Sequence, residues 1–263
     1  MKKVTPQTIR SFKGKQKFAC LTAYDAQTSR LFEEAEIPLV LIGDSVGTTH
    51  LGFKSTIPVT MEDMIRHTAA VVRGNASSLI VADLPFMAYA TETQALASAA
   101  RLMQEGGCDA VKLEGGTGKA EAIRAIVDNG IPVCGHIGLT PQSEKAIGLR
   151  VQGRDEEAAK RLLEDAKAVE AAGAFAVVLE AIPAALAEEI TQALAIPTIG
   201  IGAGAATDGQ VLVYTDMLGL GGAFSPKLAK RYAEVGAIIR DAAKAYAAEV
   251  ASGAFPGPEN TYC

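Results

Sequence analysis

Several absences narrow the possible classes of this protein. The four cysteines (Cys20, Cys108, Cys134 and Cys263) lie far apart and form no CxxC pair, which argues against a disulfide framework or a zinc site and predicts a reducing, cytoplasmic location. No window approaches 18 apolar residues without a charge or turn former, so we expect no membrane span. The basic N-terminus is not followed by an uninterrupted apolar stretch, so no signal peptide is expected.

Concentrated positive charge is also missing. The formal net charge is −5, and no basic run occurs along the chain. Nucleic acids and anionic membranes are bound by concentrated positive patches. We therefore expect small-molecule substrates, with no nucleic-acid and no membrane partner. The 263 residues, of which 49% are apolar, suit a single soluble domain with a sizeable core.

Short β-rich runs alternate with helical stretches along the chain. The runs expected to form strands are 18–25, 38–45, 78–85, 110–115, 132–139, 175–182, 196–204 and a weaker one at 217–220. Capping boxes at Thr60 with Asp63 and at Thr91 with Gln94 predict the starts of two of the helices between them. Eight β–α units favour a closed (β/α)8 TIM barrel over the alternative, an open doubly wound sheet. We expect one barrel domain over 1–263.

A further helix is predicted after the barrel. Ser225 and Pro226 suit the N-cap and the first turn of a helix, and an apolar stripe continues over 226–252. Such an appended helix can pack on a neighbouring subunit or fold back on its own barrel.

Ionisable residues follow five consecutive predicted strands. Side chains along a strand alternate between its two faces. In the second predicted strand, Asp44 therefore shares a face with Val40 and Ile42. In the fourth, Lys112 and Glu114 share one face, and Val111 and Leu113 occupy the other. The same parity picks out Asp83, His136 and Glu180 at the ends of the third, fifth and sixth strands. In a closed barrel these side chains meet at the C-terminal mouth, where barrel active sites are built. The alternative is that Asp44 and Asp83 cap helices and that His136 is a core histidine.

The residue types at the mouth predict a metal site. Carboxylates gathered together repel one another and attract a hard divalent cation, of which Mg²⁺ is the first choice. Asp44, Asp83 and Glu114 are the candidate ligands, and Lys112 can hold a substrate oxygen as a point charge.

Nine segments together resemble the ketopantoate hydroxymethyltransferase family over nearly the whole chain. The most specific in combination lie in GDSVG (43–47), ADLPFMAYAT (82–91), VKLEGG (111–116) and PVCGHIGLTPQS (132–143), and TDGQVLV (207–213) is among the other matching segments. The resemblance implies a (β/α)8 barrel in a ring-like homo-oligomer, expected to be a decamer. It implies transfer of a one-carbon unit from 5,10-methylenetetrahydrofolate to α-ketoisovalerate with the help of Mg²⁺.

The same resemblance suggests a role for each site residue. Asp44 and Asp83 are implied as direct Mg²⁺ ligands that also contact substrate, with Glu114 nearby. Ser45 and Lys112 are implied as substrate contacts and Glu180 as the general base. His136 is added as a catalytic candidate from its position alone.

The chain departs from the family pattern in three places. The segment 144–150 before VQGR lacks an aromatic residue and is one residue shorter, 226–228 reads Pro-Lys-Leu, and 259–262 reads Glu-Asn-Thr-Tyr. The first departure puts details of folate binding in doubt. Two rival functions remain at this stage: a Mg²⁺-dependent carbon–carbon lyase of the isocitrate lyase and phosphoenolpyruvate mutase type, and a non-catalytic barrel. Those lyases carry a reactive cysteine in a mobile loop, but the loop at 115–122 has none.

Overall fold

The computed structural model describes residues 2–222 and 226–262. The chain divides into two compact units, residues 1–213 and 214–263. The expectation of one domain for the whole chain stays a prediction. Among the described helices, none is long and apolar enough to span a membrane.

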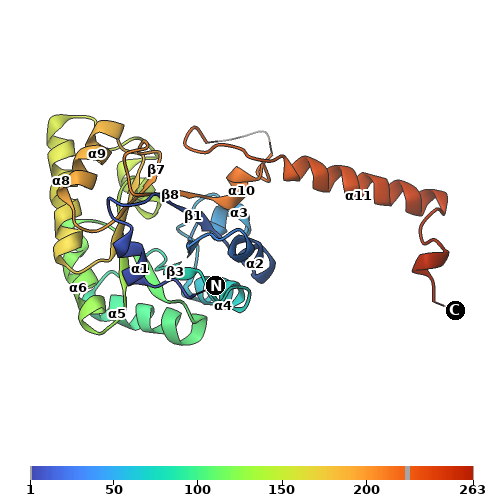
Figure 1. The fold of residues 1–263 in the computed structure, drawn as a ribbon, viewed down its shortest axis with the longest axis horizontal. Coiled ribbons are helices and arrows are strands. Elements are labelled where there is room, and N and C mark those ends of the chain that lie inside the picture. Colours follow the sequence, from blue (N-terminus) through green and yellow to red (C-terminus); the bar gives the residue numbers. More distant parts are fainter. Residues whose placement is uncertain (1, 223–225, 263) are drawn as a thin grey trace. The chain divides into compact units, whose positions relative to one another are not determined.

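Eight parallel strands close the first unit into a barrel (Figure 1). The strands are β1 (Phe18–Thr22), β2 (Leu39–Ile42), β3 (Leu79–Asp83), β4 (Ala110–Glu114), β5 (Val133–Gly138), β6 (Ala176–Glu180), β7 (Thr198–Ile201) and β8 (Gly209–Leu212). Each strand pairs with the next, and β8 pairs with β1. The (β/α)8 barrel is therefore confirmed and the open sheet is excluded.

Helices connect the strands around the outside of the barrel (Figure 1). In the first unit they are α1 (Pro6–Ser11), α2 (Ala26–Glu34), α3 (Val46–Thr49), α4 (Met61–Arg73), α5 (Glu92–Arg101), the π-helix η1 (Leu102–Gly106), the 3₁₀ helix η2 (Thr117–Lys119), α6 (Ala120–Asp128), the 3₁₀ helix η3 (Pro141–Ser143), α7 (Glu144–Ile147), α8 (Glu156–Ala171) and α9 (Ala184–Ala193). The second unit contains α10 (Tyr214–Met217), α11 (Val235–Ser252) and the 3₁₀ helix η4 (Pro258–Asn260).

Local signals start and stop these helices as expected. Thr60 and Asp63 form the reciprocal capping box that starts α4. The Thr91 hydroxyl accepts the Gln94 N–H at the start of α5. Gly173, just beyond the end of α8, has a φ of +98°, a backbone conformation that glycine adopts without steric strain.

The expected eighth strand was wrong. Residues 217–220 begin with the last residue of α10 and continue as a turn, whereas the barrel closes through Gly209–Leu212. The short run GQVL alternates between buried and exposed positions, with Gly209 and Val211 buried and Gln210 exposed. The sequence of this run predicts a strand only weakly, but pairing with β7 on one side and β1 on the other stabilises it as a strand.

The C-terminal helix also starts later than expected. It spans Val235–Ser252 and not 226–252, because residues 226–234 are not helical. Its N-cap residue is Glu234, which makes no side-chain capping hydrogen bond. Ser225, the expected N-cap, lies outside the described residues.

Side chains fill the barrel interior. Residues from all eight strands, among them Cys20, Leu41, Lys112 and Cys134, surround a central void of only about 10 Å³. Burial, the larger effect, raises the pKa of the Cys134 thiol to about 12. Cys134 is therefore a protonated packing residue at neutral pH.

Asp208 joins the segments that close the barrel near the start of β8. Its carboxylate accepts hydrogen bonds from the Thr198 N–H at 2.9 Å and the Gly14 N–H at 3.1 Å, and pairs with Lys13 at 3.0 Å. Burial alone would raise the pKa of Asp208, but these hydrogen bonds and the lysine charge lower it below the ordinary value. The charged carboxylate thus stabilises the contact between β7, β8 and the N-terminal segment.

We predict that Asp208→Asn lowers the free energy of unfolding at pH 7 by about 1–3 kcal/mol, because a charge-assisted acceptor is lost. The pKa of Asp208 is lower in the folded state than in the unfolded chain. The loss of unfolding free energy in the variant is therefore full-sized above the ordinary Asp pKa of about 4, and it disappears as the pH falls through the lowered pKa. Urea unfolding from pH 3 to pH 7 measures it. The control is Asp155→Asn, because asparagine also caps the start of α8. An Asp208→Asn penalty that does not change with pH would contradict the assignment.

Candidate active site

Four strands place ionisable side chains in the mouth of the barrel. Asp83, Lys112, Glu114 and His136 are each at most 4% exposed. Asp83 is in register with Lys112, and Glu114 with His136. Glu180, the last residue of β6, is more accessible, with its side chain 15% exposed. The inward faces of β3 to β6 are therefore those expected from strand parity.

Asp44 belongs to the same cluster but lies beyond the end of its strand. Leu39 and Leu41 face the barrel interior. The other face of β2, with Val40 and Ile42, on which Asp44 was expected, therefore points outward. Strand parity does not apply to Asp44, because β2 ends at Ile42. The chain turns at Gly43, and the Asp44 N–H then donates to Asp83 Oδ2 at 3.1 Å. Neither Asp44 nor Asp83 caps the helix that follows it. The start of α3 has no side-chain capping bond, and α5 is capped by Thr91.

Lys112 and Asp83 form a buried ion pair with Nζ and Oδ1 2.7 Å apart. Burial by itself would lower the pKa of Lys112, but the charges of Asp83, Glu114 and Asp44 outweigh it and raise that pKa. Burial raises the pKa of Asp83 to about 6, with the Lys112 charge opposing and the Asp44 charge adding to the shift. Burial likewise raises the pKa of Glu114. The cluster thus holds more negative charge than one lysine compensates.

His136 links this cluster to Glu180. Its Nδ1 lies 3.2 Å from the Lys112 ammonium, and its Nε2 lies 3.2 Å from Glu180 Oε2. Burial first, and then the Lys112 charge, lower the pKa of His136. An ammonium group only donates hydrogen bonds, so Nδ1 of the neutral ring accepts and Nε2 carries the proton. Nε2 thus faces the Glu180 carboxylate, although the two groups are not aligned for a hydrogen bond in this structure.

Ser45 lies beside the cluster at the start of α3. Its hydroxyl is 2.7 Å from the hydroxyl of Tyr24, a buried residue after β1. Burial raises the pKa of Tyr24 to about 12, against the effect of its hydrogen bonds. Tyr24 is part of the TAYD motif, but the sequence alone assigned it no role.

The donor set at the mouth fits a hard divalent cation. Asp44 and Asp83 are neighbouring residues of the cluster whose carboxylate charges both act on Lys112, and Mg²⁺ is commonly held by one or two carboxylates together with water and substrate oxygens. Over residues 2–222 and 226–262, no three His, Cys, Asp or Glu side chains are grouped so as to hold a metal. The geometry therefore offers two carboxylates, and a ligand role for Glu114 stays a prediction.

Comparison with known proteins identifies the family. The family model described as ketopantoate hydroxymethyltransferase matches residues 3–258. The chain belongs to this family. It is 55% identical to the 3-methyl-2-oxobutanoate hydroxymethyltransferase of Streptomyces coelicolor, covering 99% of this chain and 90% of the relative. It is 57% identical to the enzyme of the same name from Roseiflexus sp., covering 92% and 88%.

Solved structures of other enzymes share the fold of this ketopantoate hydroxymethyltransferase family member. Phosphonopyruvate hydrolase aligns with a TM-score of 0.65 and 12% identity, over 98% of this chain and 93% of the other. A 2,3-dimethylmalate lyase aligns with a TM-score of 0.61 and 16% identity, over 98% and 91%. At such identities the likeness concerns the fold alone.

Sequence reasoning missed one residue at the centre of the site of this family member. Gln142 is 4% exposed and bonds to both Asp44 and Glu114. It lies in η3, beyond the end of β5, so strand parity gives it no direction. The motif GLTPQ contains it, but a single glutamine among polar residues carries no signal for burial.

We predict that the His136 imidazole of the metal-free protein stays neutral at pH 6.5, because burial and the Lys112 charge lower its pKa. In Lys112→Met that pKa rises, since the neighbouring positive charge is removed. The ¹⁵N shifts of the ring nitrogens, followed against pH, measure both proteins and also report the Nε2–H tautomer. Near-UV circular dichroism checks that the variant is folded. Equal pKa values in the two proteins would contradict the assigned contact.

Proposed function

We propose that this protein is a 3-methyl-2-oxobutanoate hydroxymethyltransferase. The reaction joins the methylene carbon of 5,10-methylenetetrahydrofolate to C3 of α-ketoisovalerate, and water supplies the hydroxyl oxygen. The products are ketopantoate and tetrahydrofolate, within pantothenate biosynthesis. Family membership and the names of the relatives support the proposal. Within the structure, the observation that carries it is the linked series Asp83, Lys112, His136 and Glu180 across the mouth.

The two carboxylates Asp44 and Asp83 would hold Mg²⁺, with Glu114 close to them. When bound, the ion supplies Lewis-acid stabilisation of negative charge on the keto oxygen of the substrate. The residues fit this role because burial raises the pKa of Asp83 and the neighbouring Asp44 charge adds to that shift, and a divalent cation would favour the charged form of both carboxylates.

Lys112 and Ser45 would orient the ketoacid. The ammonium of Lys112 places positive charge in a buried mouth, where an electrostatic interaction is stronger than in water. It would stabilise the oxygen on which charge develops. The backbone N–H of Ser45 would face the substrate carboxylate.

Glu180 would act as the general base that removes the C3 proton. It is the most accessible of the ionisable side chains from β3 to β6 at the mouth. The Nε2–H of His136 lies within 3.2 Å of it and would fix the direction of its carboxylate. The electron pair left at C3 would form the new bond to the methylene carbon as the two carbon–nitrogen bonds to the folate break, one of them replaced by the bond to the water oxygen. Oriented acid–base groups of this kind contribute about 10²–10⁴-fold to rate.

Assembly and location belong to the same proposal. We expect a homo-oligomer, a decamer by family resemblance, in the cytoplasm. Apolar residues that recur along α11, such as Ile239, Tyr246 and Val250, support association, because they form a stripe along one helix. The scattered cysteines support a reducing compartment.

We predict that Glu180→Gln abolishes exchange of the C3 proton of α-ketoisovalerate but leaves Mg²⁺-dependent ketoacid binding within a few-fold of wild type, because the amide keeps the shape and loses the basic oxygen. Proton NMR in D₂O without folate measures exchange, and calorimetry measures binding. The matched control is Glu144→Gln, on α7. Retained exchange in Glu180→Gln would remove this residue from the role.

We also predict that Asp83→Ala weakens Mg²⁺-dependent ketoacid binding by at least tenfold, because one of two proposed carboxylate ligands is lost and Lys112 loses the carboxylate that lies 2.7 Å from it. Calorimetry with and without Mg²⁺ gives the result. Unchanged binding would count against the ligand assignment. Formation of ketopantoate by the wild-type protein from both substrates and Mg²⁺ tests the proposed reaction as a whole.

A further inference from the structure

Gln142 joins four segments at the mouth of the barrel. Its side-chain Nε2 donates to Asp44 Oδ2 at 2.9 Å and to the Leu84 carbonyl at 3.0 Å. Its Oε1 accepts from the Tyr89 hydroxyl at 2.6 Å, and its backbone N–H donates to Glu114 Oε2 at 3.1 Å. The ends of β2, β3 and β4 are thereby tied to the segment after β5.

These contacts allow only one orientation of the amide. Both N–H groups of Nε2 point at acceptors, and a flipped amide would bring its oxygen against the Asp44 carboxylate and the Leu84 carbonyl. The Tyr89 hydroxyl donates to the remaining oxygen and is itself buried. The direction of the amide is therefore fixed from three sides.

Asp44 needs such a clamp more than its neighbours do. Asp83 and Lys112 lie on strands of the barrel, whereas Asp44 follows a turn after the end of β2. Its backbone is held by Asp83, and its side-chain oxygen by Gln142. Partners of metal-binding carboxylates typically change metal affinity by about 10–100-fold when they are removed.

We propose that Gln142 is a positioning residue that fixes the Asp44 carboxylate for metal binding, with the Tyr89 hydroxyl fixing Gln142 in turn. This inference rests on the proposed function, in which Asp44 holds Mg²⁺. It extends that function by a residue and a mechanism: a neutral amide directs one carboxylate without adding charge to the cluster.

The test compares Gln142→Met, which keeps the side-chain length without the amide, with the wild type. Titration of Mg²⁺ in the presence of saturating α-ketoisovalerate gives the dissociation constant, and thermal unfolding gives stability. The expected result is an increase of about 10–100-fold in the Mg²⁺ dissociation constant. Thr191→Val is the control for loss of a buried hydrogen bond, because Thr191 lies on α9 and bonds to Ala187 and to Thr198 at the start of β7, away from the mouth. It should lower the melting temperature and leave the Mg²⁺ dissociation constant unchanged.

A double-mutant cycle tests the part played by Tyr89. Tyr89→Phe should raise the Mg²⁺ dissociation constant by a smaller factor, and the double variant should be no weaker than Gln142→Met alone, since Tyr89 acts through Gln142. A Gln142→Met protein that loses stability as Thr191→Val does but keeps its Mg²⁺ dissociation constant within twofold would overturn the inference. Failure of the wild type to bind Mg²⁺ with the ketoacid would instead overturn the proposed function on which it rests.

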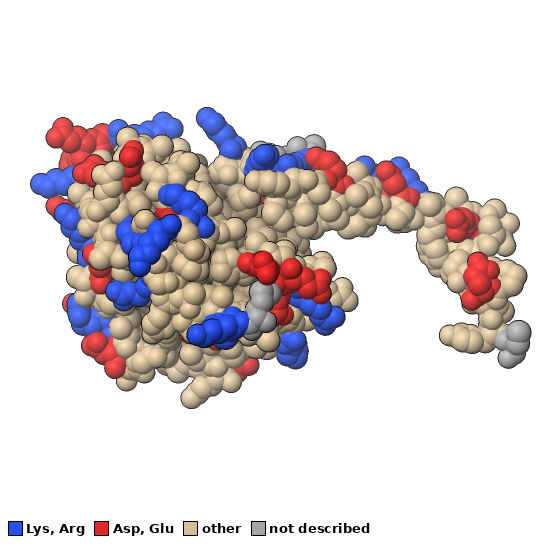
Figure 2. Space-filling model, viewed as in Figure 1, with Lys and Arg blue, Asp and Glu red and all other residues tan. Residues whose placement is uncertain are grey.

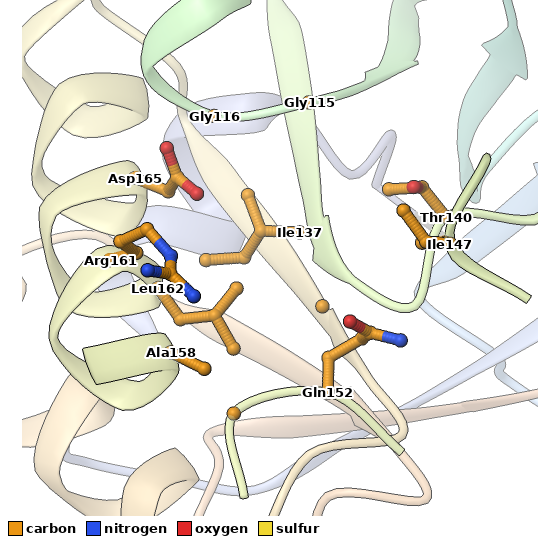
Figure 3. A pocket seen from close by; sticks show the side chains of 12 residues that line it. Gly115, Gly116, Ile137, Thr140, Ile147, Gln152, Ala158, Arg161, Leu162 and Asp165 are labelled. Carbon is orange, nitrogen blue, oxygen red and sulfur yellow. The ribbon is translucent and has the colours of Figure 1, made fainter. Parts of the chain in front are cut away.

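A second, independent observation concerns a cavity beside the ends of β4 and β5. Figure 3 shows the polar side chains of Gln152, Arg161 and Asp165 around it, with Ile137 and Leu162 between them. Its volume is about 260 Å³. The Asp165 carboxylate is fixed by the N–H and the hydroxyl of Thr117, at 2.7 and 2.8 Å.

This cavity adjoins the strand end that carries the proposed base. Gly138, in its wall, is in register with Glu180, and the Gln152 N–H donates to the Ala181 carbonyl at 2.9 Å. Sites for drug-sized ligands measure roughly 300–1,000 Å³, so this one suits a flat two-ring group and not a whole folate. A fixed carboxylate such as Asp165 is complementary to the adjacent N–H groups of an amino-oxo pyrimidine ring.

We infer that the cavity receives the bicyclic ring of the folate one-carbon donor, an inference that also rests on the proposed function. The test is Ala158→Trp, which places a large side chain in the cavity wall, compared with Lys160→Trp, an exposed position on α8 outside that wall. Calorimetry should show that Ala158→Trp binds tetrahydrofolate at least tenfold more weakly than wild type. Lys160→Trp should bind it with the affinity of wild type.

The folate-independent exchange of the ketoacid C3 proton separates the two possible failures. Ala158→Trp should exchange this proton as the wild type does, because the ketoacid site lies inside the barrel mouth. The inference would be overturned if Ala158→Trp bound tetrahydrofolate within twofold of wild type. It would also be overturned if this variant lost both folate binding and exchange of the C3 proton. Absence of Mg²⁺-dependent exchange in the wild type would instead count against the proposed function.

Discussion

The rest of the site depends on the buried ion pair between Lys112 and Asp83. One ammonium lies among three buried carboxylates, and neither charged partner is tolerated alone in such an environment. The lysine keeps Asp83 ionised near neutral pH, and it directs the neutral His136 ring so that Nε2 faces Glu180. A single charge therefore organises both the proposed metal ligands and the proposed base.

The barrel supplies this arrangement through two kinds of support. Strands β3 to β6 fix Asp83, Lys112, Glu114 and His136 by register, and the closed sheet leaves them little freedom. Asp44 lies on a turn and is held only by hydrogen bonds. Rigid strands thus carry most of the chemistry, while one ligand depends on its polar neighbours.

Much of this was predictable from the sequence because β strands alternate and barrels place strand ends together. Parity succeeded for Asp83 and Lys112, which lie on strands, and failed for Asp44, which lies beyond one. The eighth strand was misplaced because closure depends on two neighbouring strands and not on local hydrophobicity. Gln142 was missed because its role arises from contacts with residues far away in the sequence.

The most direct test of this account is a crystal structure with α-ketoisovalerate and Mg²⁺ bound to the Glu180→Gln protein. We expect a metal ion held by Asp44 and Asp83, the keto oxygen directed toward the metal and Lys112, and C3 facing residue 180 within reach of proton transfer. A ketoacid bound with C3 turned away from that residue, or a metal ion bound without Asp44 and Asp83, would contradict it.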